Sequence, residues 1–358
     1  MTVTATSGAA NVHTPFGAQS PRVVAIGGGS GLSALLRGLK RLTPHLTAIV
    51  TVADDGGSSG RLRAELGVLP PGDIRNCLVA LADDESLLSA LFSYRFKAGA
   101  LAGHSFGNLF LAALTEVTGD FDRAIKESSK VLAIRGTVLP STTSDVRLHA
   151  LLSDGRHLVG ESLIGRSPVS VQRVWLEPEG AVALPLALER IAQADIVVLG
   201  PGSLFTSVVP NLLAGGLIEA LAAADAPIVY VANVMTQPGE TAAFSGPDHL
   251  RALIGHLGRG VLDAVLVNST PVPTGLLERY DEEGAEPLRW PEPTGAAAAS
   301  AEASSAAVGD VRNPPADVER IEGVPVIRRD LLHITDHARH DPDILAACLA
   351  SMARVRRQ

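Results

Sequence analysis

Short apolar runs alternate with helical patterns along most of the chain. Five runs rich in Val, Ile and Ala predict strands, at residues 22–26, 47–52, 195–199, 228–231 and 264–267. Apolar residues at helical spacing fill the intervals, as in Leu32, Leu35, Leu36 and Leu39. Continuous apolar strands separated by helices are typical of a parallel sheet covered on both faces. The pattern predicts a doubly wound α/β fold with a mostly parallel sheet and helices on both of its faces.

One internal segment interrupts this alternation. Residues 138–177 have the pattern of a small β-rich insertion, with turn signals at 153–155 and 166–168. We expect residues 21–282, with this insertion, to form the main domain.

Two further segments are poor in apolar residues. Residues 1–20 are polar and predict a disordered tail, and residues 283–320 contain a Pro-, Ala- and Ser-rich stretch. Such a composition buries little and predicts a flexible linker or loop, with a helix through its alanine run as the alternative. Apolar residues resume at 324–327 and 344–352. Residues 321–358 should therefore return to the main domain with one strand and one helix.

Composition narrows the classes of protein. With 46% apolar residues and a mean hydropathy of +0.23, the chain can bury a core, which excludes disorder of the whole chain. The net charge is −8, and the only basic cluster is Arg354, Arg356 and Arg357. A broad nucleic-acid surface would need a basic stripe, so no nucleic-acid partner is expected.

The sequence also predicts a compartment. Cys77 and Cys348 lack metal-ligand spacing and lie among apolar neighbours, as buried thiols in a reducing compartment do. The first twenty residues have no signal-peptide pattern, and no stretch reaches the roughly 18 apolar residues of a membrane span. We expect a soluble cytoplasmic protein.

The strongest local motif follows the first predicted strand, where residues 27–34 read GGGSGLSA. This strand, glycine turn and helix start match the G-x-G-x-x-A form of the dinucleotide fingerprint of Rossmann-like folds. Glycines let backbone N–H groups approach phosphate oxygens at a helix N-terminus. A tight structural turn is the alternative. The candidate ligand-binding residues here are Gly27, Gly28, Gly29, Ser30, Gly31 and Leu32.

Two adjacent acids, Asp54 and Asp55, follow the second predicted strand. An acid at this position accepts hydrogen bonds from a ribose in Rossmann units, and a carboxylate pair could equally hold Mg²⁺. Ser58 and Ser59 offer donors to a further anion. The alternative is an acidic turn that caps a helix.

Two polar motifs each precede an apolar helix, and together they add six candidates: Asp73, Arg75, Asn76, His104, Ser105 and Asn108. Helix capping would explain one residue of each motif. It leaves the arginine, the histidine and the second asparagine without a role, which favours a ligand site.

A second glycine turn follows the run at 195–199 and contributes Gly200, Gly202 and Ser203. Asn233 follows the next strand in the same manner. Because parallel strands end at the same edge of a sheet, we expect these turns to meet in one crevice. A nucleotide with two phosphates and an attached group suits a site of that length.

Six ordered motifs resemble a known family: GGGSGLS, VADDGGSSGRLR, LPPGDIRNCLVALAD, GHSFGNLFLAAL, GPGSLFTSVVPNLL and NVMTQPGET. They are similar to the YvcK-type gluconeogenesis factors, in the superfamily of the 2-phospho-L-lactate transferase CofD. The resemblance covers residues 22–282 and the region of Arg339, His340 and Asp341.

The resemblance implies a Rossmann-like fold and a cytoplasmic UDP-sugar-binding regulator needed for cell shape and wall morphogenesis on gluconeogenic carbon sources. The implied ligand is UDP-N-acetylglucosamine or UDP-glucose. A Ser/Thr protein kinase and cell-wall synthesis proteins are the implied partners, a homodimer is the oligomer considered, and Thr335 is the candidate phosphorylation site.

Two enzyme activities remain as alternatives. A Mg²⁺-dependent transferase acting on a nucleotide-activated substrate would use Asp54, Asp55 and Asp73 as catalytic candidates, with Asp54 and Asp55 as metal ligands. Residues 56–61 depart from the acidic stretch of the transferases, which counts against phospholactate transfer. A nicotinamide oxidoreductase is the second alternative, but the sequence shows no set of residues suited to hydride transfer.

Overall fold

The computed structural model describes residues 20–82, 87–292, 311–315 and 318–354. Its main sheet is built from β1 (Val23–Gly27), β2 (Leu46–Val50), β3 (Thr137–Pro140), β7 (Ile196–Leu199), β8 (Ile228–Val231), β9 (Ala264–Asn268), β10 (Arg320–Ile321) and β11 (Val324–Arg329). The strand order is β10-β11-β9-β8-β7-β1-β2-β3, and every pair is parallel except β10 with β11. The predicted doubly wound, mostly parallel sheet is confirmed.

The direction of winding reverses between β1 and β7. From β1 the chain moves outward to β2 and β3, and later strands extend the sheet from the other side of β1 in the order β7, β8, β9. The chain therefore continues to opposite faces of the sheet after β1 and after β7. In doubly wound sheets a crevice opens at the carboxyl ends of two such strands. Both predicted glycine turns lie at this point.

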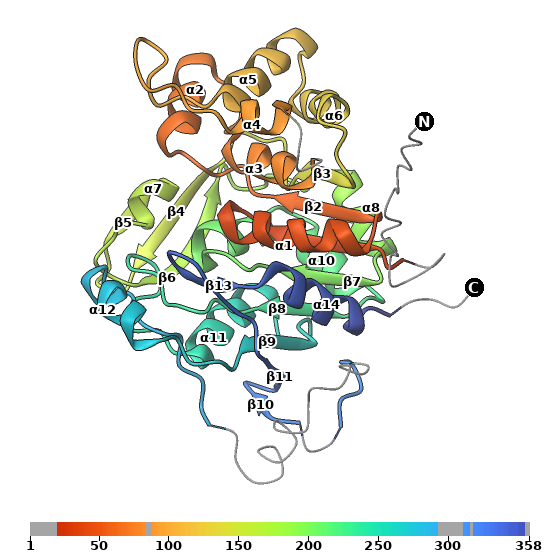
Figure 1. The fold of residues 1–358 in the computed structure, drawn as a ribbon, viewed down its shortest axis with the longest axis vertical. Coiled ribbons are helices and arrows are strands. Elements are labelled where there is room, and N and C mark those ends of the chain that lie inside the picture. Colours follow the sequence, from red (N-terminus) through yellow and green to blue (C-terminus); the bar gives the residue numbers. More distant parts are fainter. Residues whose placement is uncertain (1–19, 83–86, 293–310, 316–317, 355–358) are drawn as a thin grey trace, which may run out of the picture.

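Helices cover both faces of the sheet (Figure 1). They are α1 (Gly29–Leu42), α2 (Gly57–Leu66), α3 (Gly72–Leu81), α4 (Leu87–Ser93), α5 (Phe106–Thr118), α6 (Phe121–Val131), α7 (Glu161–Ile164), α8 (Pro185–Gln193), the π-helical turn η1 (Leu204–Val208), α9 (Val209–Leu212), α10 (Leu217–Ala222), α11 (Gly246–Leu257), α12 (Thr274–Glu282) and α14 (Pro342–Met352). Helix α1 packs against α3 and α14, and α8, α9, α10 and α11 pack on the opposite face. Among the residues described, no helix is long and apolar enough to cross a membrane.

The β-rich insertion is a separate antiparallel sheet of β4 (Arg147–Leu152), β5 (His157–Val159) and β6 (Val171–Glu177), in the order β5-β4-β6. The predicted insertion began too early, at residue 138. Residues 137–140 instead form β3, which pairs with β2 at the edge of the main sheet.

The C-terminal segment returns to the main domain. Strand β11 pairs with β9, a hairpin of β12 (Leu332–Ile334) and β13 (Ala338–His340) follows, and α14 packs on α1. Gly38 makes the α1–α14 contact close, because a Cβ there would lie 2.0 Å from the carbonyl oxygen of Pro342.

The predicted linker differs from the structure at both ends. Leu288 is buried and its N–H donates to the Val234 carbonyl, and Val311 is also buried. These apolar side chains pack because the Ala- and Ser-rich composition is concentrated in the middle of residues 283–320. The middle, residues 293–310, and the predicted tail, apart from residue 20, lie outside the described residues.

Candidate functional site

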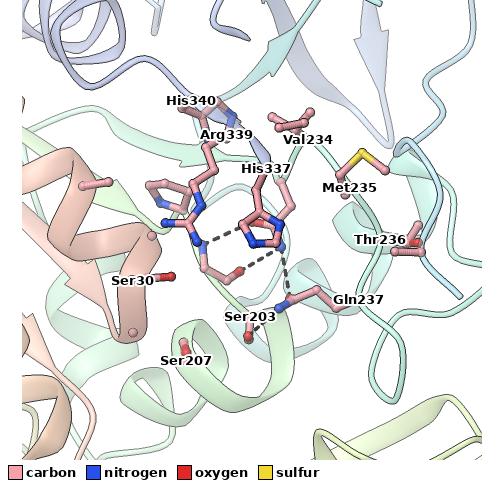
Figure 2. Close-up of a pocket in the computed structure, with 18 of the residues that line it drawn as sticks. Ser30, Ser203, Ser207, Val234, Met235, Thr236, Gln237, His337, Arg339 and His340 are labelled. Carbon is pink, nitrogen blue, oxygen red and sulfur yellow. Dashed lines mark hydrogen bonds between the residues drawn. The ribbon is translucent and has the colours of Figure 1, made fainter. Parts of the chain in front are cut away.

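A cavity of about 310 Å³ lies where the sheet reverses direction. Its walls are the start of α1 (28–31), the turn after β7 (201–203), the segment after β8 (233–238) and the end of the β12–β13 hairpin (337–340) (Figure 2). Ser207 and Tyr280 are among the other residues that line it. The two glycine turns and Asn233 thus come together as the sequence predicts.

The glycine turn after β1 leads directly into the N-terminus of α1. Gly28 is fully extended and has no side chain to cap α1, and Gly29 has a positive φ of 64°. A Cβ on Gly31 would lie 2.5 Å from the carbonyl oxygen of Pro201, so this turn packs directly on the second glycine turn. The N–H groups at the start of α1 add partial positive charge, which favours an anion.

Three predicted residues of these turns do not line the cavity. Gly27 ends β1, and its carbonyl accepts a hydrogen bond from the Asn211 side chain. Leu32 is fully buried in the core beneath α1. Gly200 has a positive φ of 77° and turns the chain after β7. These residues shape the turns without facing the cavity.

A chain of amide hydrogen bonds fixes the second turn. Asn233 accepts from the Gly202 N–H at 3.2 Å and donates to the Gly202 carbonyl at 3.0 Å. Asn233 also donates to Gln237, and the Gln237 amide donates to Ser203 Oγ at 2.7 Å (Figure 2). Gln237 was not predicted as a site residue, although it lies in the NVMTQPGET motif.

The β12–β13 hairpin supplies the opposite wall, with His337, Arg339 and His340 (Figure 2). The Arg279 guanidinium of α12 contacts the Asp336 carbonyl and His337 Nδ1 and so holds the hairpin tip. Of the sequence patterns, only the family resemblance pointed to this segment, because nothing local connects it to the glycine turns.

His340 is a buried member of this wall. Burial lowers its pKa to about 4, although a hydrogen bond to the Ala232 carbonyl works in the opposite direction. The ring is therefore neutral at pH 7. Thr335 is exposed in the turn between β12 and β13, so its side chain is accessible; its phosphorylation stays a prediction.

An acidic cluster borders the first glycine turn, and its residues are not among those that line the cavity. Burial, and then the charge of Asp54, raises the pKa of Asp73 to about 6, and Asp73 accepts a hydrogen bond from the Gly29 N–H. Glu161 of α7 joins the cluster: burial and the charges of Asp54 and Asp73 raise its pKa to about 8. Sequence reasoning missed Glu161, because it belongs to the insertion. Three acids thus share one partly buried region.

Asp54 and Asp55 have separate partners. Asp54 Oδ1 accepts from the Gly56 N–H at 2.8 Å, and Asp55 Oδ1 accepts from the Ser162 N–H at 2.8 Å. Burial raises the pKa of Asp54. Over the described part of the chain, no group of three or more His, Cys, Asp or Glu side chains is arranged to hold a metal ion.

Arg75 and Asn76 accompany the acids. Asn76 hydrogen-bonds to Asp73, and the charges of Asp73 and Asp54 partly offset the lowering of the Arg75 pKa by burial and by Arg95. The structure thus brings Asp73 and Arg75 close to Asp54, the acid that follows β2.

The remaining predicted residues form hydrogen bonds with neighbours outside the cavity. Ser58 Oγ pairs with His104 Nδ1 at 3.0 Å, and Ser59 Oγ accepts from the Gly72 N–H at 3.1 Å. Ser105 caps α5 by accepting from the Asn108 N–H. The polar motif at residues 104–108 therefore contributes to the packing of α2 and α5, and His104, Ser105 and Asn108 do not line the cavity.

The fold and the cavity define a doubly wound α/β protein with two glycine turns facing each other where its sheet reverses. Residues 23–307 match the family model described as 2-phospho-L-lactate transferase CofD. The chain belongs to the CofD family.

Within that family the similarity is to gluconeogenesis factors. The gluconeogenesis factor of Bacillus subtilis is 45% identical over 340 residues, covering 94% of this chain and 99% of that protein. A relative from Nostoc sp. is 55% identical over 272 residues, which span 75% of this chain and 60% of that protein. A crystal structure of a UPF0052 family member from Bacillus halodurans superposes with a TM-score of 0.80 at 44% identity, covering 92% of this chain and 98% of that one.

Proposed function

We propose that this protein is a cytoplasmic gluconeogenesis factor that binds a UDP-sugar, UDP-N-acetylglucosamine or UDP-glucose, in the cavity between the two glycine turns. The observation that carries the proposal is the meeting of these turns with Arg339 in one cavity where the sheet reverses. Backbone N–H groups and a guanidinium are the donors that a diphosphate needs. In this proposal the protein acts as a regulator of cell shape and wall morphogenesis during gluconeogenic growth.

A thermal-shift experiment tests the ligand. At about 100 times its dissociation constant, a ligand stabilises the fold by about 2.7 kcal/mol, which means a Tm shift of at least several degrees. We expect this shift with UDP-N-acetylglucosamine or UDP-glucose and none with uridine. A shift with GDP but with no uridine nucleotide would contradict the proposal.

Two variants locate the binding. Gly29→Val should abolish the shift, because a β-branched side chain fits poorly at φ 64° and obstructs the turn. Arg339→Ala should weaken binding and leave the ligand-free Tm nearly unchanged, because this side chain is exposed. Arg156→Ala, at the exposed β4–β5 turn, is the matched control and should bind as the unmodified protein does.

The acidic cluster favours a second candidate function, Mg²⁺-dependent group transfer. Asp54 and Asp73 would be the residues near Mg²⁺, because a cation would counter both causes of the raised Asp73 pKa, burial and then the charge of Asp54. The Asp54–Asp55 pair fits less well, since the two carboxylates have different partners. Release of labelled sugar or UMP from a UDP-sugar only when Mg²⁺ is present would favour this function over the regulator.

The proposed partners are a Ser/Thr protein kinase, cell-wall synthesis proteins and a second copy of the chain. Thr335 is the proposed phosphorylation site. Phosphopeptide mapping after incubation with a cellular kinase fraction would test it, and phosphate found only at other residues would remove Thr335.

A further inference from the structure

The direction of every hydrogen bond around Asn233 follows from one backbone group. The Gly202 N–H can only donate, so the atom that accepts it must be the side-chain oxygen of Asn233. The other atom is then the amide nitrogen, and its two hydrogens go to the Gly202 carbonyl and to Gln237. Exchanging the oxygen and the nitrogen of the Asn233 amide would place two donors or two acceptors opposite each other.

The same reasoning applies to Gln237. The Gln237 atom that accepts a hydrogen from Asn233 at 3.2 Å must be the oxygen Oε1, so the Gln237 amide nitrogen is the atom that faces Ser203 at 2.7 Å. An amide N–H donates, so Ser203 Oγ is the acceptor. The hydroxyl hydrogen of Ser203 is left over, and among the described residues no protein acceptor receives it. Ser203 and Gln237 both line the cavity (Figure 2).

We propose that Gln237 is a positioning residue: it occupies a lone pair of Ser203 Oγ, so that the hydroxyl hydrogen points into the cavity and donates to a phosphate oxygen of the ligand. This inference rests on the proposed function, because it takes the ligand to carry phosphate. Phosphate oxygens only accept hydrogen bonds, and the unused hydroxyl hydrogen of Ser203 matches them. Gln237 takes one of the two lone pairs of Ser203 Oγ, so a ligand donor has one acceptor position left there instead of two.

A double-mutant cycle measures the coupling, with affinity for UDP-N-acetylglucosamine read by calorimetry at pH 8. Ser203→Ala should weaken binding about 10-fold, since it removes a hydrogen bond to a charged group. Gln237→Leu should weaken it several-fold alone and have almost no effect when Ser203→Ala is already present. Ser207→Ala is the matched control: it removes another cavity hydroxyl, and the effect of Gln237→Leu should persist beside it.

Gln237→Glu provides a readout that loss of structure would not give. An ionised carboxylate takes the Ser203 hydrogen for itself, so this variant should bind more weakly than Gln237→Leu at pH 8. Near pH 4, just below the ordinary Glu pKa of about 4.3, most of these carboxyl groups are protonated and can donate to Ser203 Oγ again. The affinity should then recover relative to the unmodified protein at the same pH. The diphosphate of a UDP-sugar stays ionised across this range, so the recovery reports the side chain.

The outcomes separate this inference from the proposed function. Equal effects of Gln237→Leu with and without Ser203 would overturn the positioning role, as would the absence of acid recovery in Gln237→Glu, while UDP-sugar binding would stand. If no UDP-sugar binds, the proposed function fails, and pyrophosphate becomes the probe for the same cycle. Coupled losses of pyrophosphate affinity would support the role of Gln237, and uncoupled or absent losses would overturn it.

Discussion

Replacement of Asp73 by Asn should stabilise the protein, and more so at higher pH. Asp73 lies partly buried beside Asp54 and accepts a hydrogen bond from the Gly29 N–H. The pKa of Asp73 rises from 3.8 to about 6 in the folded protein, because burial and the neighbouring charge disfavour its ionised form. Asparagine keeps an oxygen for the Gly29 N–H and removes the charge.

The sign and size of the stability change follow from this shift in the pKa of Asp73. Below pH 4 both the folded and unfolded chains hold the proton, so the carboxyl group costs nothing. As the pH rises to about 6, the unfolded chain releases the proton while the folded chain retains it, and stability falls. The shift of about two pKa units corresponds to about 3 kcal/mol, at about 1.36 kcal/mol per unit. Asp73→Asn should therefore raise the Tm by up to about 5 °C at pH 8 and hardly at all at pH 4.

Differential scanning fluorimetry at pH 4, 6 and 8, in EDTA to exclude divalent cations, measures this dependence. Asp154→Asn is the control with the opposite sign, because hydrogen bonds from Arg156 lower the pKa of that exposed carboxyl. It should lower the Tm slightly at pH 8. A Tm difference for Asp73→Asn that is the same at all three pH values would refute the reasoning.

Three further predictions concern the core. Gly38→Ala should cost about 1–3 kcal/mol in urea unfolding, because its Cβ would meet a backbone carbonyl of α14, whereas Gly255→Ala on α11 meets nothing within 4 Å and should not. Cys77 is fully buried with a raised pKa, so iodoacetamide should label it only in denaturant, as mass spectrometry of its peptide would show. Burial lowers the pKa of His249 and His340 to about 4, so the stability that these neutral rings contribute is complete above pH 6.5 and is lost as the pH drops to 4, opposite to the trend from Asp73. His249→Gln should therefore change the slope of unfolding free energy against pH, and a difference from the unmodified protein that is constant between pH 6.5 and 4 would contradict this expectation.

The parts of the fold that the sequence predicted are those with local signals. Five Val- and Ile-rich runs became adjacent parallel strands, and the glycines after β1 and β7 mark turns that only small residues allow. The parallel-sheet argument then placed Gly31, Gly202 and Asn233 at one edge, because it applies to any loop that leaves a strand.

The same argument does not apply where no strand of the sheet precedes the motif. His104 and Asn108 lie at the start of α5, which belongs to a group of helices at the upper end of the molecule in Figure 1. Arg339 shows the converse: its position in the cavity depends on the pairing of β11 with β9 and on the hairpin that follows. Contacts between residues this distant in sequence leave no local pattern, and only the family resemblance pointed to that segment.

The cavity wall formed by the β12–β13 hairpin has a consequence for synthesis on the ribosome. Gly31 emerges well before Arg339, and translation at about 5–20 residues per second separates them by roughly 15–60 s. During this interval the first glycine turn exists without its opposite wall, and β9 lacks its neighbour β11. In the proposed function, ligand capture therefore waits until the hairpin has been synthesised. Ribosome-stalled chains ending before the hairpin should not retain the UDP-sugar that the released protein is proposed to bind.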